Sequence, residues 1–417
     1  MDSSPSQPSY TIILLGDLML GRLIDQLLPQ HVHEPTEARH VASFLRSRPH
    51  LKSYNHVSPW GNTLPVLHSA DLLLGNLETA VTTHTAKWPD KVFNYRMHPA
   101  NVACLIEAGV DYVSLANNHT LDFGEQGLVD TVRTIGDAGI AFAGAGRTVE
   151  EARKPAVLTL PSRKSETSRR ETDGGDGGNV EQNSHPIHLY AFSDHPRDWA
   201  RVPQFNLLSY NSQFRHDVKF QLAPPTALAA PSLKIVSVHW GPNYAWHPAS
   251  SIVSMAHFLI DECGVDIIHG HSSHHIQGVE LYRGKLIIYG CGDFVDDYAV
   301  TREFRNDLSA AWRVTVAETA EQETTGQDPS RGGSGLAEDV AAAKSKLIPI
   351  KLEVFPNRIT HFQAGFLDKS DPDHAWVSNK FRRLCADFGT KVEDELGEQG
   401  QIVVDLTWQG QAKTSSE

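Results

Sequence analysis

The chain has 417 residues, of which 40% are hydrophobic and 21% charged, a composition typical of a globular protein with a sizeable core. Its formal net charge of −13 argues against non-specific binding to nucleic acid and against docking on anionic membranes. The same charge would repel a polyanionic ligand unless a local positive centre, such as a metal ion, received it.

The N-terminal residues are polar and carry no basic segment, so residues 1–10 are predicted to be a polar leader. No apolar run reaches the length of a signal-peptide core or of a membrane span. The four cysteines are scattered and form no CxxC pair, which favours reduced thiols over a disulfide framework. These features predict a cytoplasmic protein with no nucleic-acid partner and no membrane insertion.

Short apolar runs alternate with helical patterns along the chain. In the first half, strands are expected at 11–15, 71–74, 112–115 and 140–144, and helices at 102–108 and 125–138. In the second half, a helix is expected at 251–263 and strands at 188–192, 233–238, 265–268, 286–289, 347–355 and 358–365. This alternation predicts an α/β fold.

Two segments interrupt the pattern. Residues 161–186 and about 318–345 are polar, rich in Gly or Ser and poor in apolar side chains, so both are predicted to be low-complexity insertions. Residues 409–417 are predicted to be a disordered tail. We interpret the rest of the chain, 11–408, as a single domain.

Metal-binding or acid/base side chains follow six of the predicted strands. They are Asp17, Glu78, Asn118 with His119, His239, His271 with His274, and Asp293. Asp and Asn are common in turns and helix caps, so one such junction would mean little. Histidine has no such preference, yet three junctions supply it. Because ligand sites in α/β folds gather at the carboxyl ends of strands, the junctions predict a shared metal site.

The ligand types indicate the chemistry of that site. Carboxylate, amide and imidazole groups without thiolate suit one or two divalent ions such as Mn, Fe or Zn. Two adjacent ions can clamp the oxygens of a phosphate-like transition state, and His119 would then protonate the leaving group. Asp122 is a candidate to orient His119, although a helix N-cap explains it equally well. For the His-rich segment 269–275, a surface loop that binds no metal is the alternative.

The junctions as a set resemble a known family. They read Gly16-Asp17, Gly75-Asn76-Leu77-Glu78, Ala116-Asn117-Asn118-His119, His239-Trp240-Gly241, the segment from Gly270-His271 to Gln277, and Tyr289 to Phe294. This order resembles the signature of the bacterial capsule-synthesis CapA family, also called the poly-γ-glutamate synthesis accessory family, from about Thr11 to Tyr298. That family is similar to the calcineurin-like metallophosphoesterases, which implies a four-layer αββα sandwich with a two-metal centre between its sheets.

The resemblance also implies roles for individual residues. The expected metal ligands are Asp17, Glu78, Asn118, His239, His271 and His274; the expected catalytic residues are His119 and Asp122; the expected substrate contacts are Asn76, Asn117 and Arg96. Arg96 lies on the polar loop 80–98 and could bind a substrate carboxylate bidentately, although a solvated loop fits equally well. Met19 and Ser273 stand where the phosphoesterase motifs have histidines, which leaves His274 as a substitute ligand and puts a second metal in doubt.

Two functions fit these residues. The first is a metal-dependent hydrolase that cleaves a phosphoester or a γ-glutamyl-type bond of an anionic small-molecule or polyglutamate-like substrate. The second is a non-catalytic accessory protein that holds a polymer or a synthase partner, as the substitutions at Met19 and Ser273 suggest. A purely structural protein, the third interpretation, would bind no stoichiometric metal.

Overall fold

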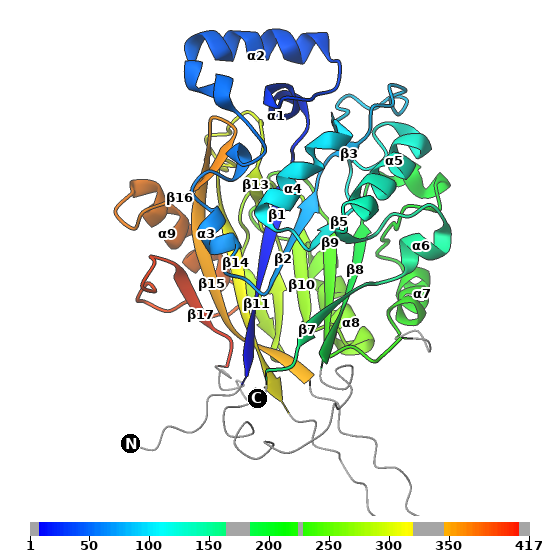
Figure 1. Ribbon diagram of the computed structural model, residues 1–417. Helices are drawn as coiled ribbons and strands as arrows, with labels where there is room; N and C mark the ends of the chain where they lie inside the picture. Colours follow the sequence, from blue (N-terminus) through cyan, green and yellow to red (C-terminus); the bar gives the residue numbers. More distant parts are fainter. Residues whose placement is uncertain (1–7, 164–183, 224–227, 320–345, 408–417) are drawn as a thin grey trace, which may run out of the picture.

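The computed structural model describes residues 8–163, 184–223, 228–319 and 346–407 of the chain (Figure 1). These residues form a mixed α/β structure built on two mixed β-sheets, as the alternating pattern predicts. Within the described ranges, no helix is both long and apolar enough to cross a membrane.

The first sheet contains nine strands, and its main path runs in the order β16-β15-β14-β1-β2-β5-β6. Strand β13 also pairs with β1, and β17 pairs with β15. The bounds are β1 Ser9–Leu18, β2 Leu72–Leu77, β5 Tyr112–Ser114, β6 Ala141–Ala143, β13 Asp293–Val295, β14 Leu308–Thr319, β15 Lys346–Thr360, β16 Gln363–Phe366 and β17 Ile402–Asp405. Strands β1, β2, β5 and β6 are parallel, so their carboxyl ends lie at one edge of the structure.

The second sheet contains six strands in the order β11-β12-β10-β9-β8-β7. Their bounds are β7 Ala156–Pro161, β8 Ser184–Ser193, β9 Leu233–His239, β10 Ile267–His271, β11 Val279–Tyr282 and β12 Lys285–Ile288. Strands β8, β9, β10 and β12 are parallel, and β7 and β11 are antiparallel edge strands. A separate short pair joins β3 (Ala80–Val81) to β4 (Arg96–Met97).

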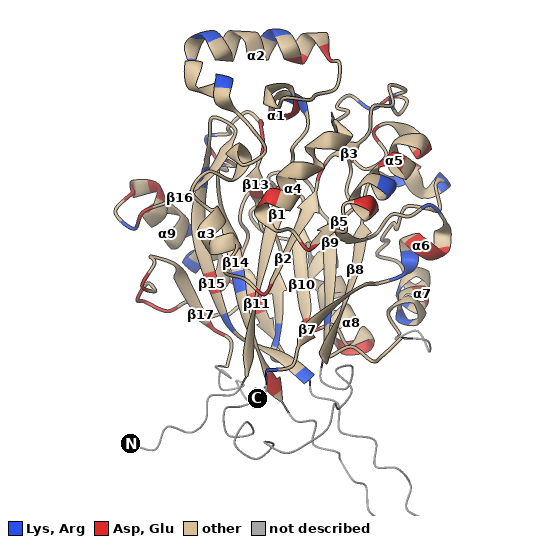
Figure 2. Cartoon of the chain, in the orientation of Figure 1, with Lys and Arg blue, Asp and Glu red and all other residues tan. Residues whose placement is uncertain are grey.

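Helices cover the sheets on their outer sides. Helices α7 (Ser212–Leu222) and α8 (Ser250–Cys263) bury Val218, Met255 and Leu259 against the second sheet. Helices α4 (Ala103–Ala108) and α5 (Gly124–Asp137) pack Leu105 and Val132 into the core of the first sheet. The other helices are α1 Arg22–Leu27, α2 Pro35–Ser47, α3 Leu64–Leu67, α6 Val149–Arg153 and α9 Pro372–Ala386. Helix α2 extends beyond the ends of the sheets (Figure 1), and charged side chains concentrate on helices and loops rather than on the strands (Figure 2).

The two faces of the second sheet enter different cores. Successive strand residues point to opposite faces, so Ile235 and Ile267 join the large core shared with the first sheet, whereas Val236 and Ile268 pack under α7 and α8. Each fully buried side chain of this size contributes about 1.5–3 kcal/mol. A polar contact also ties the sheets together, because the His269 Nε2 atom lies 2.9 Å from the Leu15 carbonyl oxygen.

Several boundaries differ from the sequence predictions. Strand β1 begins at Ser9 and Tyr10 is fully buried, so the leader is shorter than 1–10. Residues 184–186 belong to β8 rather than to an insertion, because His185 pairs with Leu160 of β7. Glu318 belongs to β14, where it pairs with Leu347. Pro161 ends β7, Thr319 ends β14, and residues 162–163 are also described. The rest of the two predicted insertions, 164–183 and 320–345, and the predicted tail 409–417 lie outside the described residues.

The two predicted closing strands are also organised differently. Residues 346–360 form one continuous strand, β15, and only Gln363–Phe366 form a second strand, β16. Pro356 does not interrupt β15, because its carbonyl oxygen still accepts a hydrogen bond from the Leu367 backbone N–H at 2.9 Å. A proline in a strand removes only the donor of its own residue.

Candidate metal centre

The predicted junctions meet because parallel strands of both sheets end on the same side of the molecule. Within the first sheet, β-pairing sets Asp17 directly beside Asn76 of β2 and beside Asp293 of β13. Within the second sheet, it sets His239 of β9 directly beside His271 of β10. Strand register therefore assembles most of the site before any loop is considered.

Two glycines permit the close approach of strands at this point. A Cβ atom at Gly16 would lie 1.7 Å from the carbonyl oxygen of Gly292, and one at Gly270 would lie 2.2 Å from that of Tyr289. Without side chains there, the Asp17 backbone N–H donates to the Gly292 oxygen at 3.1 Å. These contacts hold the strand ends that carry Asp17, His271 and Asp293 close together.

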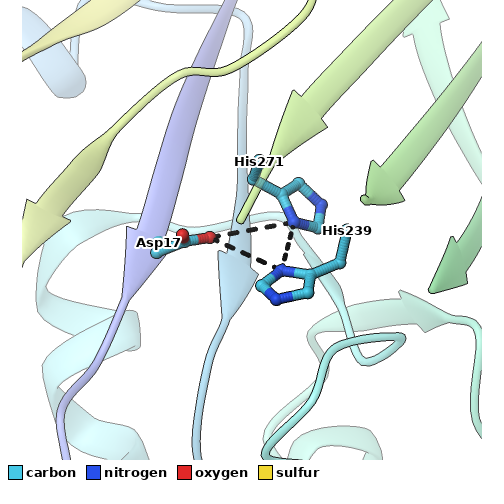
Figure 3. A group of neighbouring side chains, drawn as sticks. All are labelled: Asp17, His239 and His271. Atoms are coloured by element: carbon cyan, nitrogen blue, oxygen red, sulfur yellow. Dashed lines mark hydrogen bonds and ion pairs between the residues drawn. The ribbon is translucent and has the colours of Figure 1, made fainter. Parts of the chain in front are cut away.

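The first candidate ligand group consists of Asp17, His239 and His271 (Figure 3). The Asp17 Oδ1 atom lies 3.7 Å from His271 Nδ1 and 4.0 Å from His239 Nδ1, and the two Nδ1 atoms are 2.9 Å apart. Burial, followed by the neighbouring imidazoles, lowers the pKa values of both histidines well below the ordinary range. Both rings are therefore neutral, which is the form that binds metals.

The second candidate group consists of Asp17, Glu78, His274 and Asp293, whose ligand atoms lie within 4.8 Å of one another. The His274 Nδ1 atom is 2.8 Å from Asp293 Oδ1 and 3.8 Å from Asp17 Oδ2. Burial raises the pKa of Asp17 to about 7. Burial and the neighbouring carboxylates raise the pKa values of Glu78 and Asp293 well above their ordinary values. If all its carboxyl groups were ionised, this group would hold more buried negative charge than the described residues around it neutralise.

The donor atoms themselves fit a divalent cation. Four buried atoms of the site have no hydrogen-bond partner among the described residues: Glu78 Oε1, Asn118 Oδ1, His239 Nε2 and Asp293 Oδ2. Leaving a buried polar atom unsatisfied costs about 1–3 kcal/mol. A cation bound to these oxygens and nitrogens would remove that cost, and the mixed ligand set suits Mn, Fe or Zn. The buried His, Asp and Glu side chains thus form a candidate metal centre.

His119 lies at the edge of this centre. Its Nδ1 atom is 2.6 Å from Asp122 Oδ2, and its Nε2 atom is 3.9 Å from Glu78 Oε1. The Tyr95 ring stacks on the imidazole with centroids 3.9 Å apart, and Lys91 forms an ion pair with Asp122. Asp122 is thus in direct contact with the imidazole that it was predicted to orient, and the N-cap of α5 is Phe123. Burial lowers the pKa of His119 to about 4.

The structure gives the three predicted substrate residues other contacts. Asn76 donates to Asp17 Oδ1 at 2.7 Å, and Asn117 donates to Asn76 Oδ1 at 3.1 Å, with both side chains fully buried. Asn76 thus positions the carboxylate of Asp17, and Asn117 positions Asn76 in turn. Arg96 is 5% exposed and pairs with Glu34 at 2.7 Å, so its guanidinium is occupied by a contact within the protein. The residue type alone does not tell whether an Asn or Arg side chain contacts a substrate or forms an internal hydrogen bond.

The positions that depart from the phosphoesterase pattern take on other roles. Met19 is fully buried in the core. The Ser273 hydroxyl donates to the His275 carbonyl oxygen at 2.7 Å, so it faces the backbone. His274, with a positive φ of 61°, instead directs its imidazole to Asp293 and Asp17. A left-handed backbone is uncommon outside glycine, and at His274 it brings the imidazole into the second ligand group.

Several residues of the site were not found from the sequence. The Tyr298 hydroxyl donates to Glu78 Oε2 at 3.4 Å, and Ser237 Oγ lies 3.0 Å from His271 Nε2. Asp194 and His195 directly follow β8, and the His195 ring lies 5.1 Å from the His239 ring. The last pair carried a usable signal, because it repeats the same pattern of a strand followed by acidic and imidazole side chains.

The sequence profile of the family described as bacterial capsule synthesis protein PGA_cap matches residues 11–298 of the chain. The chain belongs to this family. A probable polyglutamine synthesis accessory protein of Mycobacterium tuberculosis (strain H37Rv) is 34% identical over 397 residues, which cover 92% of this chain and 93% of that protein. The capsule biosynthesis protein CapA of Bacillus anthracis is 26% identical over 295 residues, covering 70% of this chain and 61% of that protein. The PGA_cap match includes every predicted ligand.

Solved structures are more distant from this PGA_cap chain. A hypothetical protein from Thermus thermophilus has a TM-score of 0.33 and 13% identity, and covers 75% of this chain and 94% of its own. GAP50, described as the anchor in the inner membrane complex of Plasmodium, has a TM-score of 0.29 and 10% identity, and covers 75% and 84%. Scores this low carry no argument for a shared fold.

Proposed function

We propose that this chain is a metal-dependent hydrolase that cleaves a phosphoester or a γ-glutamyl-type amide bond of an anionic substrate. One observation carries the proposal: strand ends from both sheets place two overlapping ligand groups in a buried site, where four donor atoms lack hydrogen-bond partners among the described residues. A purely structural protein would be destabilised by such unsatisfied groups. A metallophosphoesterase-type αββα arrangement, inferred from the family resemblance, is part of this proposal.

The proposed roles follow from the contacts of each side chain. Asp17, His239 and His271 would hold one ion, and Asp17, Glu78, His274 and Asp293 a second, with Asn118 Oδ1 as a further ligand. A divalent ion held there would supply Lewis-acid activation of the bond to be cleaved. Asn76 fixes the carboxylate of Asp17, and Tyr298 contacts that of Glu78.

His119 is proposed to transfer the proton. Asp122 binds its Nδ1 atom, so Nε2 is the atom that faces Glu78 and the bond to be cleaved. With a pKa of about 4 the free imidazole is neutral near pH 7. An anionic substrate beside Nε2 would raise that pKa, because a nearby negative charge favours the imidazolium. Substrate binding itself would then prepare His119 to donate a proton to the leaving group.

A non-catalytic accessory role is the second candidate. It is favoured by the closure of the site, since Asp17, Glu78, His239, His271 and Asp293 are all fully buried and a thick polymer could not reach them directly. In that case the chain would hold a polyglutamate-like polymer or a synthase partner on its surface. Such binding should survive His119→Ala, whereas turnover should not. The cytoplasmic location, and the lack of nucleic-acid and membrane partners, stay predictions from the sequence.

The test begins with metal content. Elemental analysis of the purified protein, beside His271→Ala and Asp17→Ala, should give one or two equivalents of Mn, Fe or Zn that both variants lose. The loaded protein is then screened against phosphodiesters and γ-glutamyl amides, with His119→Ala as the inactive control. A wild-type protein that neither contains metal nor takes it up on reconstitution would overturn the hydrolase proposal and leave the accessory role.

A further inference from the structure

A large cavity lies beside the candidate metal centre. We call it the lateral cavity; it has a volume of about 940 Å³ and is lined by parts of segments 194–200, 207–211 and 241–243 and by Asn118. These segments follow β8 and β9, whose ends also carry His195 and His239. The volume is in the range of small-molecule binding sites.

The inner end of the lateral cavity abuts the candidate ligands. His195, which lines the cavity, has its ring centroid 5.1 Å from that of the buried His239. Asn118, also in the lining, carries one of the buried oxygen atoms that lack a hydrogen-bond partner among the described residues. Gly241 lies only two residues beyond His239. A molecule in the cavity would therefore reach from solvent to the edge of the metal centre.

The wall at this inner end is fixed by a half-buried hydrogen-bond network. Asp194 binds His195 Nδ1 and accepts hydrogen bonds from the Tyr210 hydroxyl at 2.7 Å and from the Gly241 N–H at 2.9 Å. These three hydrogen bonds occupy the carboxylate of Asp194. The bond to Asp194 uses only Nδ1 of His195, so the Nε2 atom can contact a ligand.

The outer part of the lateral cavity carries one uncompensated cation. Arg197 lines the cavity, is exposed, and forms no ion pair with any residue that the structure describes. The other exposed polar side chains that line the cavity, Asn211 and Asn243, are neutral amides. The exposed carboxylate of the adjacent Asp198 does not line the cavity and accepts a hydrogen bond from Trp88 Nε1 at 2.6 Å. In a chain with a net charge of −13, an unpaired arginine in a cavity next to the candidate centre attracts anions locally. A single guanidinium can bind a carboxylate bidentately, through two parallel N–H···O hydrogen bonds.

We propose that the lateral cavity binds the carboxylate-bearing part of an acidic substrate, with Arg197 paired to the carboxylate and His195 beside the bond held at the metal centre. This inference rests on the proposed function, and it adds the cavity that holds the substrate and the residue that selects it. The carboxylate lies several bonds from the bond to be cleaved, because Arg197 lines the outer part of the cavity and His195 the inner end.

The test measures binding without turnover. All proteins carry His119→Ala, and the probe is a fluorescently labelled tetramer of γ-linked glutamate, compared with the same tetramer in which every carboxylate is a carboxamide. Fluorescence anisotropy is recorded for the parent, for Arg197→Gln and for the matched control Arg201→Gln. Arg201 lies on the same short 3-10 helix, η6 (Arg197–Arg201), but packs over the Trp88 ring and does not line the cavity.

The parent should bind the acidic tetramer more tightly than the amide, and Arg197→Gln should weaken acidic binding about tenfold or more while Arg201→Gln does not. Equal binding of the acidic probe by the parent and by Arg197→Gln would overturn the inference. So would equal binding of acid and amide by the parent, or no binding of either. The proposed hydrolase activity fails on a different readout, the absence of metal-dependent turnover by protein with His119 intact, so the two failures are distinguishable.

Discussion

Two buried acidic regions of this molecule behave in opposite ways. Glu353 of β15 is 5% exposed and accepts hydrogen bonds from Arg313, Lys351 and Gln401 at 2.9–3.0 Å. Burial alone would raise its pKa, yet the hydrogen bonds lower that pKa to about 2. Glu78 in the candidate centre is fully buried and has an orphaned oxygen among the described residues, and its pKa is raised well above the ordinary value.

Burial pushes the pKa of both carboxyl groups upward, and the hydrogen-bond partners of Glu353 reverse that rise. The Glu353 region contains its own cations and is electrostatically complete. The candidate ligands are acids, neutral imidazoles and an amide, so an added cation would stabilise the ionised form of the acids. Asp122 is an intermediate case, because it lies in the site but pairs with Lys91.

The largest expected effect is that of Asp17→Ala, since Asp17 belongs to both ligand groups. Metal affinity should fall on the order of 100-fold or more, as removal of even an outer-shell partner costs 10–100-fold, and turnover should vanish with it. Elemental analysis after dialysis measures the loss. Asp217→Ala, which removes an exposed carboxylate from α7, is the matched control and should keep its metal. Full metal content in Asp17→Ala would contradict this expectation, because it would show that Asp17 does not bind the metal.

Asp122→Asn tests the partnered carboxylate inside the site. The variant should lower kcat by about 10²- to 10⁴-fold, because His119 loses the group that fixes its Nδ1 proton. Its metal content should stay at the wild-type level, since Asp122 is in neither ligand group. Glu125→Gln, in the first turn of α5, controls for a change of charge nearby and should leave kcat unchanged. Loss of metal in Asp122→Asn would instead make Asp122 part of the centre.

Removal of the metal should destabilise the wild-type protein. A ligand at about 100 times its Kd stabilises a fold by about 2.7 kcal/mol, so chelation should lower Tm by a few degrees. Differential scanning calorimetry with and without chelator measures the shift. Asp17→Ala provides the internal comparison, because a protein that binds no metal should unfold at the same temperature in both conditions.

The smallest expected effect is that of a substitution in the Glu353 region. Glu353→Gln should destabilise the protein by about 1–3 kcal/mol at pH 7, because charged hydrogen bonds to Arg313 and Lys351 are lost. The native pKa of Glu353 is depressed from 4.5 to about 2, so its contribution is complete above about pH 4.5 and is lost as pH falls toward 2. Urea unfolding should therefore show a gap between wild type and variant at pH 7 that narrows at pH 3. A constant gap would mean that the carboxylate charge is not what stabilises this region.

The fold class and the convergence of the junctions could be predicted because their signals are local. The apolar run before Asp17 and the one before His239 each end in a polar ligand type, and parallel pairing makes strand ends meet. Strand β14 received no prediction, although residues 312–316 alternate apolar with polar side chains just before a low-complexity segment. His195 was missed although its junction has the same design as the others.

The roles of the amide and guanidinium groups could not be predicted from the sequence. Asn117 binds Asn76 across 41 positions, and Arg96 pairs with Glu34 across 62 positions. Such pairs are set by tertiary contacts, and the short sequence around each residue does not contain its partner. The substitute ligand His274 was identifiable as a candidate, but its left-handed backbone, which aims the ring inward, was not.

The contact between Gly16 and the Gly292 carbonyl oxygen has a consequence for engineering of the metal preference. The gap between β1 and β13 at this point is too narrow for a methyl group. The spacing of Asp17 and Asp293 therefore depends on Gly16 having no side chain. In a saturation library of all positions, Gly16 should be as intolerant as the ligands themselves, although it offers no donor atom. A redesign for a larger ion would have to begin with the backbone at this pair of glycines before any ligand is exchanged.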